Sequence, residues 1–438
     1  MKWKALAATV LLGIASAAQA VKPEEVKTFT LPNGMKFIVL ESSTIPNANM
    51  YTFWKVGSRN EVPGITGLSH FFEHMMFNGS KKYGPKMFDR TMEANGGSNN
   101  AYTSNDVTVY QDWFPASSLE TIFALESDRI GYLNIDPKMV ASERGVVLSE
   151  RSTGLENSNV RMLMEEVNGT AFRAHPYSWS VIGHESDIKA WTQDDLVRYF
   201  QTYYSPNNAV AVVVGDVKFE KVKQLATQYF GKLPKRALPP EVRTVEPDQK
   251  GERRVFVAKP SVTSPNLMIA YKIPQLSHED FYALDVLQSI LTTGRTSRLY
   301  KGLVEQQLAT QVNAMSMNGF DPGLLYLYGV AAAKVDPGKL EQALLAEVDK
   351  LIRDGVSDEE LQKVKNQKLV NLYRAMETIN GKAQNLGNYE VFHGDYKKLF
   401  TAPEQYQKLT AADIQRVAAK YLIKSQRTVG VLAAKEDE

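Results

Sequence analysis

Two stretches in different halves of this chain share one pattern of residues. The first is WTQDDLVRYFQTYYSPNNAVAVVVGD, residues 191–216, and the second is LTAADIQRVAAKYLIKSQRTVGVLAA, residues 409–434. Four positions agree between them: Thr192 with Thr410, Asp195 with Asp413, Arg198 with Arg416, and Tyr203 with Tyr421. Each stretch ends in an apolar run that is typical of a buried strand. The match predicts two domains of similar fold in tandem.

A proline-rich segment separates the two copies of the pattern. Residues 231–254, GKLPKRALPPEVRTVEPDQKGERR, contain four prolines and many charged residues, which is typical of a linker between domains. The 438 residues of the chain also exceed the length of one ordinary domain. We therefore expect an N-terminal domain over residues 21–235, a linker over 236–250 and a C-terminal domain over 251–438, both of the α+β class.

Local patterns in the first half predict both strands and helices. Strand-forming residues on either side of Pro-Asn-Gly at 32–34 predict a hairpin. Residues 67–77 have the periodicity of a helix, whereas NNAYTSNDVTVYQDWF at 99–114 alternates and predicts a strand. The stretch from about residue 117 to 157 is helical in pattern, and Asp136-Pro137 inside it is a typical helix start.

The first twenty residues, MKWKALAATVLLGIASAAQA, have the pattern of a secretory signal peptide. Two lysines precede an apolar run that is too short to span a bilayer, and Ala18-Gln19-Ala20 forms an A-x-A cleavage site. We expect cleavage after Ala20. The chain has no cysteine, so the exported protein is held together without disulfides. The short alanine-rich signal predicts a periplasmic location in a bacterium.

The overall charge excludes some classes of partner. The chain has 51 basic and 49 acidic side chains, a formal net charge of +2, so no excess of positive charge predicts binding to nucleic acid or to an anionic membrane. Hydrophobic residues make up 43% and charged residues 23%, the balance of a globular protein without a membrane span.

His70, Glu73 and His74 form an H-x-x-E-H motif inside the predicted helix. Positions i and i+4 of a helix lie on one face and i+3 lies beside them, so both imidazoles and the carboxylate project to the same side. Two imidazoles at this spacing can bind one Zn²⁺. The alternative is an ordinary helix in which two partly exposed histidines are neighbours.

A catalytic zinc needs a third protein ligand and one open coordination position. Glu143 and Glu150 are candidates, because seven residues are two helical turns and place both side chains on one face. Apolar and basic residues adjoin them, as on a partly buried face with paired charges: Arg144, Val146, Val147, Leu148 and Arg151. The alternative is a solvated acidic stripe.

Several blocks of the sequence resemble the pitrilysin/insulinase-type zinc metallopeptidases, which are inverzincins. The resemblance is to the two-domain branch that includes the mitochondrial processing peptidases and their bacterial periplasmic relatives, and it covers nearly the whole mature chain. The blocks are VGSRNEVPGITGLSHFFEHMMFNGS, NNAYTSNDVTVY, ERGVVLSE, HPYSWSVIGHESDI and SRLYKGLVEQQLA. The resemblance implies two homologous α/β-sandwich domains, each an antiparallel-rich sheet packed with helices, that form a bowl-shaped half of a chamber.

The resemblance also implies roles for the acidic and histidine residues. His70, His74 and Glu150 would ligate one Zn²⁺ per chain, and Glu73 would be the catalytic base. Glu143 would orient one of the ligand histidines.

The segment SNNAYTS, residues 98–104, is an exposed edge strand beside the zinc in the family that the sequence resembles. An extended peptide can add to such an edge through main-chain hydrogen bonds. Asn100 and Ala101 are therefore the candidate substrate-binding residues. The alternative is an ordinary core strand.

The second half departs from the family pattern. The family has an Arg and a Tyr in a block resembling LREKxGLAY, but LVEQQLATQV at 303–312 has Val304 and Thr310 in those places. The second half also lacks an H-x-x-E-H motif, since its histidines are His278 and His393. The sequence therefore predicts a zinc-bearing subunit whose missing Arg and Tyr come from a paralogous subunit, or a homodimer that works without them. Arg298 and Tyr300 occupy another part of the block, and we interpret them as structural.

The predicted function is a zinc-dependent endopeptidase that hydrolyses short or unfolded peptides. Two alternatives are a non-catalytic scaffold subunit of the same fold and a peptide-binding module with a structural zinc. Glu73 argues against a scaffold, which needs no general base. Three candidate ligands and no cysteine favour an open site over a closed structural one.

Overall fold

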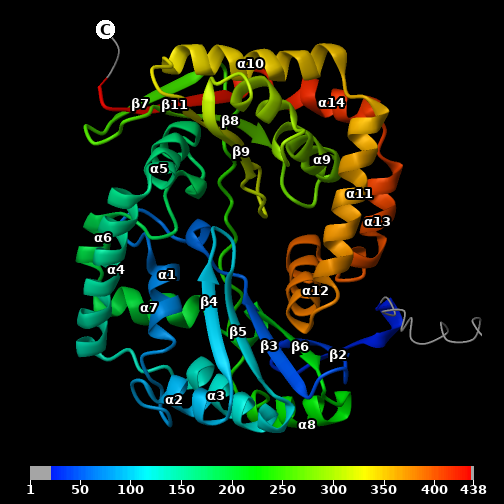
Figure 1. Cartoon of the computed structure of the whole chain (residues 1–438). Helices are drawn as coiled ribbons and strands as arrows, with labels where there is room; N and C mark the ends of the chain where they lie inside the picture. Colours follow the sequence, from blue (N-terminus) through cyan, green and yellow to red (C-terminus); the bar gives the residue numbers. More distant parts are fainter. Residues whose placement is uncertain (1–20, 436–438) are drawn as a thin grey trace, which may run out of the picture.

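The computed structural model describes residues 21–435 of the chain, and the predicted signal peptide lies outside this range. Two mixed β-sheets lie at opposite ends of the molecule (Figure 1). The first has the order β1-β2-β6-β3-β5-β4: β1 (Val26–Thr30), β2 (Lys36–Glu41), β6 (Ala209–Gly215), β3 (Asn47–Trp54), β5 (Thr108–Pro115) and β4 (Ser98–Thr103). The second has the order β7-β11-β8-β10-β9: β7 (Arg253–Ala258), β11 (Arg427–Ala433), β8 (Asn266–Ile273), β10 (Gly323–Ala331) and β9 (Ala309–Ser316).

The two sheets have the same topology, apart from the additional strand β1. In the first sheet β6 pairs in parallel with β2 and antiparallel with β3, and in the second β11 pairs in parallel with β7 and antiparallel with β8. The preceding helices, α7 (Gln193–Tyr203) and α14 (Ala411–Tyr421), begin with the same capping box, Thr192 with Asp195 and Thr410 with Asp413. The predicted α+β fold with two similar halves is confirmed.

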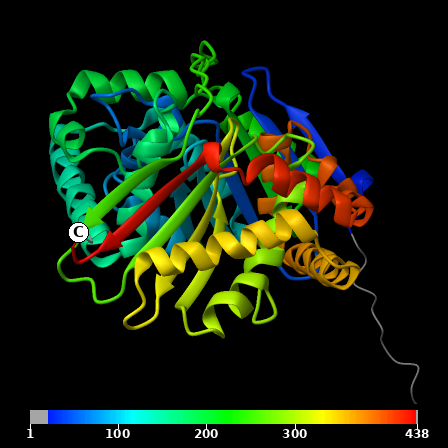
Figure 2. The same cartoon turned by 90° about the horizontal axis from the view of Figure 1, so that it is seen from above.

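Helices of the same half cover one face of each sheet. Alternate strand residues on that face join the helices in a large apolar core, as the period of two in a strand requires. Helices of the first half are α1 (Leu68–Met75), α2 (Met87–Ala94), α3 (Leu119–Tyr132), α6 (Glu185–Ala190) and α8 (Phe219–Tyr229), besides α7. In the second half α9 (Phe281–Thr292), α10 (Pro337–Asp354) and α14 take this place, and Figure 2 shows α10 lying over the second sheet.

A helix from the opposite half covers the other face of each sheet. Helix α5 (Asn159–Ala171) continues from α4 (Pro137–Asn157) and packs on β7, β8 and β11 of the second sheet. Helix α12 (Ile379–His393) follows α11 (Asp358–Ala375), precedes α13 (Lys398–Lys408) and packs on β3 and β6 of the first sheet. Figure 1 shows these helix pairs on opposite sides of the molecule. Each half therefore completes the core of the other.

Two glycines permit this exchange of helices. A Cβ atom built on Gly387 of α12 would lie 2.0 Å from the ring of Phe53 in β3. A Cβ atom built on Gly430 of β11 would lie 2.4 Å from Val167 of α5. Each contact lies where a helix of one half crosses a strand of the other, so the absent side chains set how closely helix and sheet approach.

The structure corrects one predicted element and adds detail to others. Residues 99–114 are not one strand, because the chain turns at 104–107 and β4 and β5 pair as an antiparallel hairpin. The predicted helical stretch from about 117 to 157 is two helices, and α4 starts at Pro137 with Asp136 as its N-cap, as the sequence predicts. No helix within residues 21–435 is long and apolar enough to cross a membrane.

We predict that Gly387→Ala destabilises the protein by about 1–3 kcal/mol, the usual cost of overpacking a core. Replacing Gly by Ala inside a helix normally stabilises the protein by about 1 kcal/mol. The contact with Phe53 is expected to turn this gain into a loss of stability. Gly145→Ala in α4 is the control, since a Cβ atom there meets nothing within 4 Å. Urea unfolding of both variants is the measurement, and equal stabilities would show that the close approach of α12 is not a constraint.

Candidate metal centre

Helix α1 carries the H-x-x-E-H motif, and its surroundings hold it firmly. Gly67 precedes it with a φ of 88°, and a side chain there would collide with the carbonyl of Ile182. The buried carboxylate of Glu61 accepts hydrogen bonds from the backbone N–H groups of Gly67 and Ser69 at 2.7 and 2.8 Å. One face of α1 is buried in the first core: Leu68, Phe71, Phe72 and Met75. His70, Glu73 and His74 therefore lie on the opposite face of α1, away from this core.

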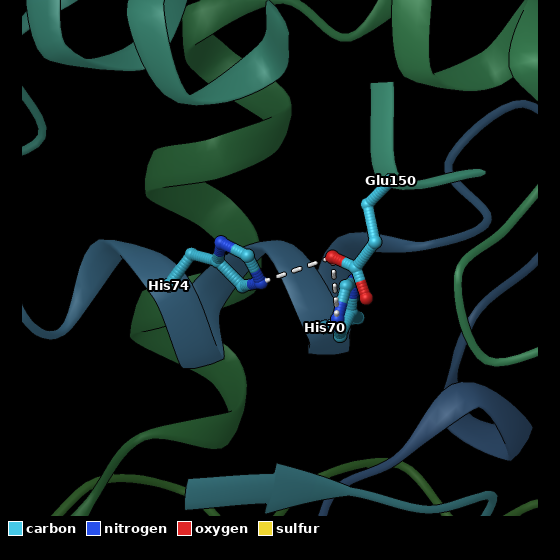
Figure 3. Close-up of side chains that lie close together, drawn as sticks. All are labelled: His70, His74 and Glu150. Carbon is cyan, nitrogen blue, oxygen red and sulfur yellow. Dashed lines mark ion pairs between the residues drawn. The ribbon is translucent and has the colours of Figure 1, made fainter. Parts of the chain in front are cut away.

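The three predicted ligands converge at one point (Figure 3). Nε2 of His70 lies 3.7 Å and Nε2 of His74 lies 3.6 Å from Oε2 of Glu150. One donor atom from each residue lies within 4.8 Å of the others. His70 and His74 come from α1 and Glu150 comes from α4, the helix that packs against it.

The donor set and its spacing fit zinc. Two donors that each lie at the usual zinc distance of about 2.1 Å in a tetrahedron are about 3.4 Å apart. The distances from Glu150 to the two imidazoles differ from this value by only a few tenths of an ångström. Two imidazoles and one carboxylate, with a fourth position left over, are the ligand set of open zinc sites.

Glu143 lies two helical turns before Glu150 in α4, and its hydrogen bond orients His74. Nδ1 of His74 donates to Oε1 of Glu143 at 2.7 Å, and Asn78 donates to the other carboxylate oxygen at 2.7 Å. The hydrogen bond from His74 lowers the pKa of Glu143, so this carboxylate is an acceptor. With Nδ1 protonated, the lone pair of Nε2 faces Glu150, which is the arrangement that a metal ligand requires.

The pKa values of the two histidines shift in opposite directions. Burial lowers the pKa of His70 to about 4, and the neighbouring His74 adds to this effect. Burial acts in the same direction on His74, but the hydrogen bond and charge of Glu143, with the charges of Glu150 and Glu73, raise its pKa overall. His70 is thus neutral at ordinary pH, as a metal ligand must be.

Glu73 is not one of the three clustered donors, and it lines a depression together with His74. Burial raises its pKa, and the charge of Glu150 adds to this, although the hydroxyl of Thr103 and the charge of His74 oppose it. Thr103, at the end of β4, donates to Oε2 of Glu73 at 2.5 Å. The carboxylate is held close to the donors and is less acidic than an exposed one.

The candidate substrate-binding residues line a depression beside this carboxylate. Asn100 and Ala101 lie in β4, which pairs only with β5 and is the edge of the first sheet. The depression has a volume of about 300 Å³, and its other lining residues are Glu73, His74, Phe77, Asn78, Asp89, Asn99 and Glu143. The edge strand therefore runs alongside the candidate metal centre.

Arg144 and Arg151 of α4 have partners outside their own helix. Arg144 donates to the carbonyl of Trp191 at 2.6 Å, and Arg151 pairs with Glu165 of α5 at 2.6 Å. Among the described residues, neither arginine forms an ion pair with the glutamate that precedes it, and Arg151 is paired within a partly buried face, as the sequence pattern suggests. Glu143 and Glu150 face α1, and this leaves both carboxylates to the histidines.

The second half has different chemistry where the first has its donor cluster. Helix α9 packs on α11 and α14 as α1 packs on α4 and α7, but its Asp285 pairs with Lys368 at 2.7 Å. Val304 packs against the second core, and the hydroxyl of Thr310 donates to the carbonyl of Val330 at 3.4 Å. Arg298 donates to Glu360 and Gly355, which agrees with a structural role.

Sequence patterns did not single out Thr103 and Asn78. Thr103 donates a hydrogen bond to the carboxylate of Glu73, and Asn78 donates one to the carboxylate of Glu143. In both pairs the two residues are far apart in the sequence. Neither residue type has a spacing rule that predicts such a contact. Asn78 could have been found as the residue one helical turn after His74 on the same face.

Two similar α+β halves, an H-x-x-E-H helix and a distant glutamate that meets both histidines are features of the inverzincin class. Two family models match the chain: insulinase (peptidase family M16) over residues 37–185 and peptidase M16 inactive domain over residues 190–368. The chain is 32% identical to the zinc protease PqqE of Helicobacter pylori over 425 residues, which cover 96% of this chain and 95% of that protein. The chain therefore belongs to peptidase family M16.

Solved structures agree with this assignment. A protease from Helicobacter pylori has a TM-score of 0.90 at 31% identity and covers 93% of this chain and 99% of that chain. The periplasmic protease PqqL from Escherichia coli has a TM-score of 0.78 at 21% identity, and the match covers 95% of this chain but 48% of that chain. The fold of the whole chain is therefore equivalent to about half of that longer protein.

We predict that His70→Ala, His74→Ala and Glu150→Ala each abolish stoichiometric zinc, because two remaining ligands hold the ion too weakly. Metal analysis of the purified variants, with unfolding curves to show that they are folded, is the measurement. A full complement of zinc in Glu150→Ala would disprove the choice of third ligand.

Glu143→Gln is expected to weaken zinc binding about 10–100-fold, since it removes the negative charge that orients His74. Competition with a chromophoric chelator measures the affinity. Glu156→Gln, an exposed position on the same helix, is the matched control and should leave the affinity unchanged. Equal affinities of the two variants would show that the contact between Glu143 and His74 does not support the metal.

Proposed function

We propose that this protein is a zinc-dependent endopeptidase with one Zn²⁺ per chain, held by His70, His74 and Glu150. The observation that carries the proposal is the meeting of these three donors beside the carboxylate of Glu73, next to an open sheet edge. The names of the relatives in the family, zinc proteases, support the same metal and reaction class.

The residues around the donors suit peptide hydrolysis. When bound, zinc would supply Lewis-acid chemistry, which acidifies water and polarises a carbonyl. Glu73 would take a proton from the attacking water and later pass it to the leaving amine. A general base works best when its pKa is close to the working pH, and burial raises that of Glu73 in this direction. Thr103 would keep the carboxylate in place through its hydrogen bond.

The edge strand β4 would bind the substrate. Its free main-chain groups can pair with an extended peptide, and Asn100 and Ala101 line the depression beside Glu73. Only a chain without its own secondary structure can pair in this way, so the substrates would be short or unfolded peptides.

Non-catalytic alternatives explain less of the site. A scaffold subunit would have no use for a half-buried carboxylate held beside the donors. A structural zinc is usually enclosed by four protein ligands, whereas the described residues provide three. The pattern of the first twenty residues, and the periplasmic location in the name of PqqL, favour a periplasmic enzyme.

A second subunit would complete the site. Val304 and Thr310 are engaged by their own half, so neither place offers an Arg or a Tyr to a substrate. This chain matches about half of the longer PqqL chain, which supports a unit of this fold that works together with further protein. A paralogous subunit that faces this chain is therefore the proposed partner, with a homodimer as the simpler possibility.

Glu73→Gln is expected to keep stoichiometric zinc but to lower kcat by at least about 10², because the amide cannot accept a proton. Cleavage of an unstructured fluorogenic peptide and metal analysis of the same sample are the measurements. Glu93→Gln, an exposed glutamate in α2, is the control. Near-normal turnover of the Glu73 variant would rule out Glu73 as the base.

The homomer is expected to be a weak peptidase, since loss of one oxyanion donor typically costs about 10²–10³ in kcat. A homologous subunit with Arg and Tyr in the block that aligns with residues 303–312 should raise the rate by a similar factor. The measurement is a titration of this protein with that subunit, and with its Arg→Ala variant as the control. A homomer with full activity and no response to the subunit would refute the shared site.

A further inference from the structure

A second depression lies on the opposite side of the metal donors from the one beside Glu73. It has a volume of about 330 Å³, and His70 and Glu150 form part of its wall. Six apolar residues line it as well, from α4, α5, the segment 179–182 and the second half: Leu155, Met164, Trp179, Val181, Ile182 and Met317. A substrate that crosses the donors along β4 would place a residue in this depression.

The other charged residues of the lining are Arg151, Arg161 and Glu165. Within the described residues, Arg161 is the one of these three without a partner. Arg151 binds Glu165 with both of its terminal nitrogens, at 2.6 and 3.2 Å, and donates to Ser180 as well. These two charges therefore cancel. Glu150 faces the two histidines. Within residues 21–435, the guanidinium of Arg161 has neither an ion pair nor a hydrogen-bond acceptor, so it is the charge that remains for a ligand.

The position of Arg161 has no structural explanation in the helix that carries it. It is the third residue of α5, where the helix dipole favours acidic residues and disfavours a cation. Its side chain extends toward α4, and a Cβ atom built on Gly154 would lie 3.4 Å from Nη1. Arg161 also lines another depression along α4, together with Gly154 and Glu150, so its side chain is shared by both depressions.

We propose that Arg161 determines specificity by binding a carboxylate of the peptide substrate in this depression. The apolar wall would contact the aliphatic part of the substrate residue, and the guanidinium would bind its acidic end. A glutamate side chain fits this combination, and so does the C-terminal carboxylate of a short peptide. The proposal rests on the proposed peptidase function and names the substrate group that the site selects.

The test compares matched peptides that differ by one charge. A set of unstructured peptides carries Glu, Gln or Lys at each position near the cleaved bond, each with a free or an amidated C-terminus. The ratio of kcat/KM for the Glu and Gln peptides is measured for the wild-type protein, together with the ratio for the acid and amide forms. We expect about a 2–5-fold preference for the charged form at one position or at the C-terminus, the size of an exposed charge pair.

Charge reversal then identifies the residue. Arg161→Glu should abolish the preference for a carboxylate and create a preference for the Lys peptide of about the same size at the same position. Arg243→Glu is the matched control, because Arg243 is exposed in the segment between the halves and lines none of the depressions beside the donors. It should retain the wild-type ratios.

The outcomes separate this proposal from the proposed function. If no peptide is cleaved in a chelator-sensitive manner, the peptidase function itself fails, and binding of the peptides to Glu73→Gln still tests the selectivity. If peptides are cleaved but both arginine variants keep the wild-type ratios, Arg161 does not select a carboxylate. Preference at a side chain or at the C-terminus decides which of the two sources of the carboxylate is used.

Discussion

The reciprocal packing of α5 and α12 on the opposite sheets is the constraint on which the rest of the structure depends. Each sheet has two apolar faces, and one of them is covered by a helix from the other half. Helix α4, which carries Glu143 and Glu150, leads directly into α5, which is anchored on the second sheet. The third donor of the candidate metal centre is therefore positioned by contacts that both halves must make.

Polar contacts between the halves act in the same direction. Arg59, which precedes α1 in the chain, pairs with Asp321 in the loop between β9 and β10. His175 donates to the same carboxylate at 3.0 Å. Gly319 of that loop lies so close to Asp106 and Tyr177 that a Cβ atom would be 2.3 Å from each. This loop also brings Met317 to the depression beside the donors. The second half thus contributes to the surroundings of the site although it lacks donors of its own.

The two halves show how one fold can carry a cluster of candidate metal donors in one copy and an ion pair in the other. In the first half, two imidazoles of α1 face a carboxylate of α4. In the second half, Asp285 of α9 faces Lys368 of α11, and Tyr406 donates to the same aspartate at 2.7 Å. An ion pair satisfies its own charges, whereas two imidazoles and a carboxylate offer lone pairs to a cation once the imidazoles are deprotonated. The backbone arrangement is shared, and a few side chains decide the chemistry.

The sequence alone determined the features that depend on local spacing or on repetition. The period of the helix places His70, Glu73 and His74 on one face and Glu143 and Glu150 on another, and the matching capping boxes at Thr192 and Thr410 reveal the two similar halves. The tertiary structure alone decided that α5 and α12 exchange sheets, that Thr103 meets Glu73, and that Arg151 is neutralised by Glu165 whereas Arg161 is free within the described residues. These contacts join residues from separate elements, and no periodicity in the chain encodes how one packed element lies against another.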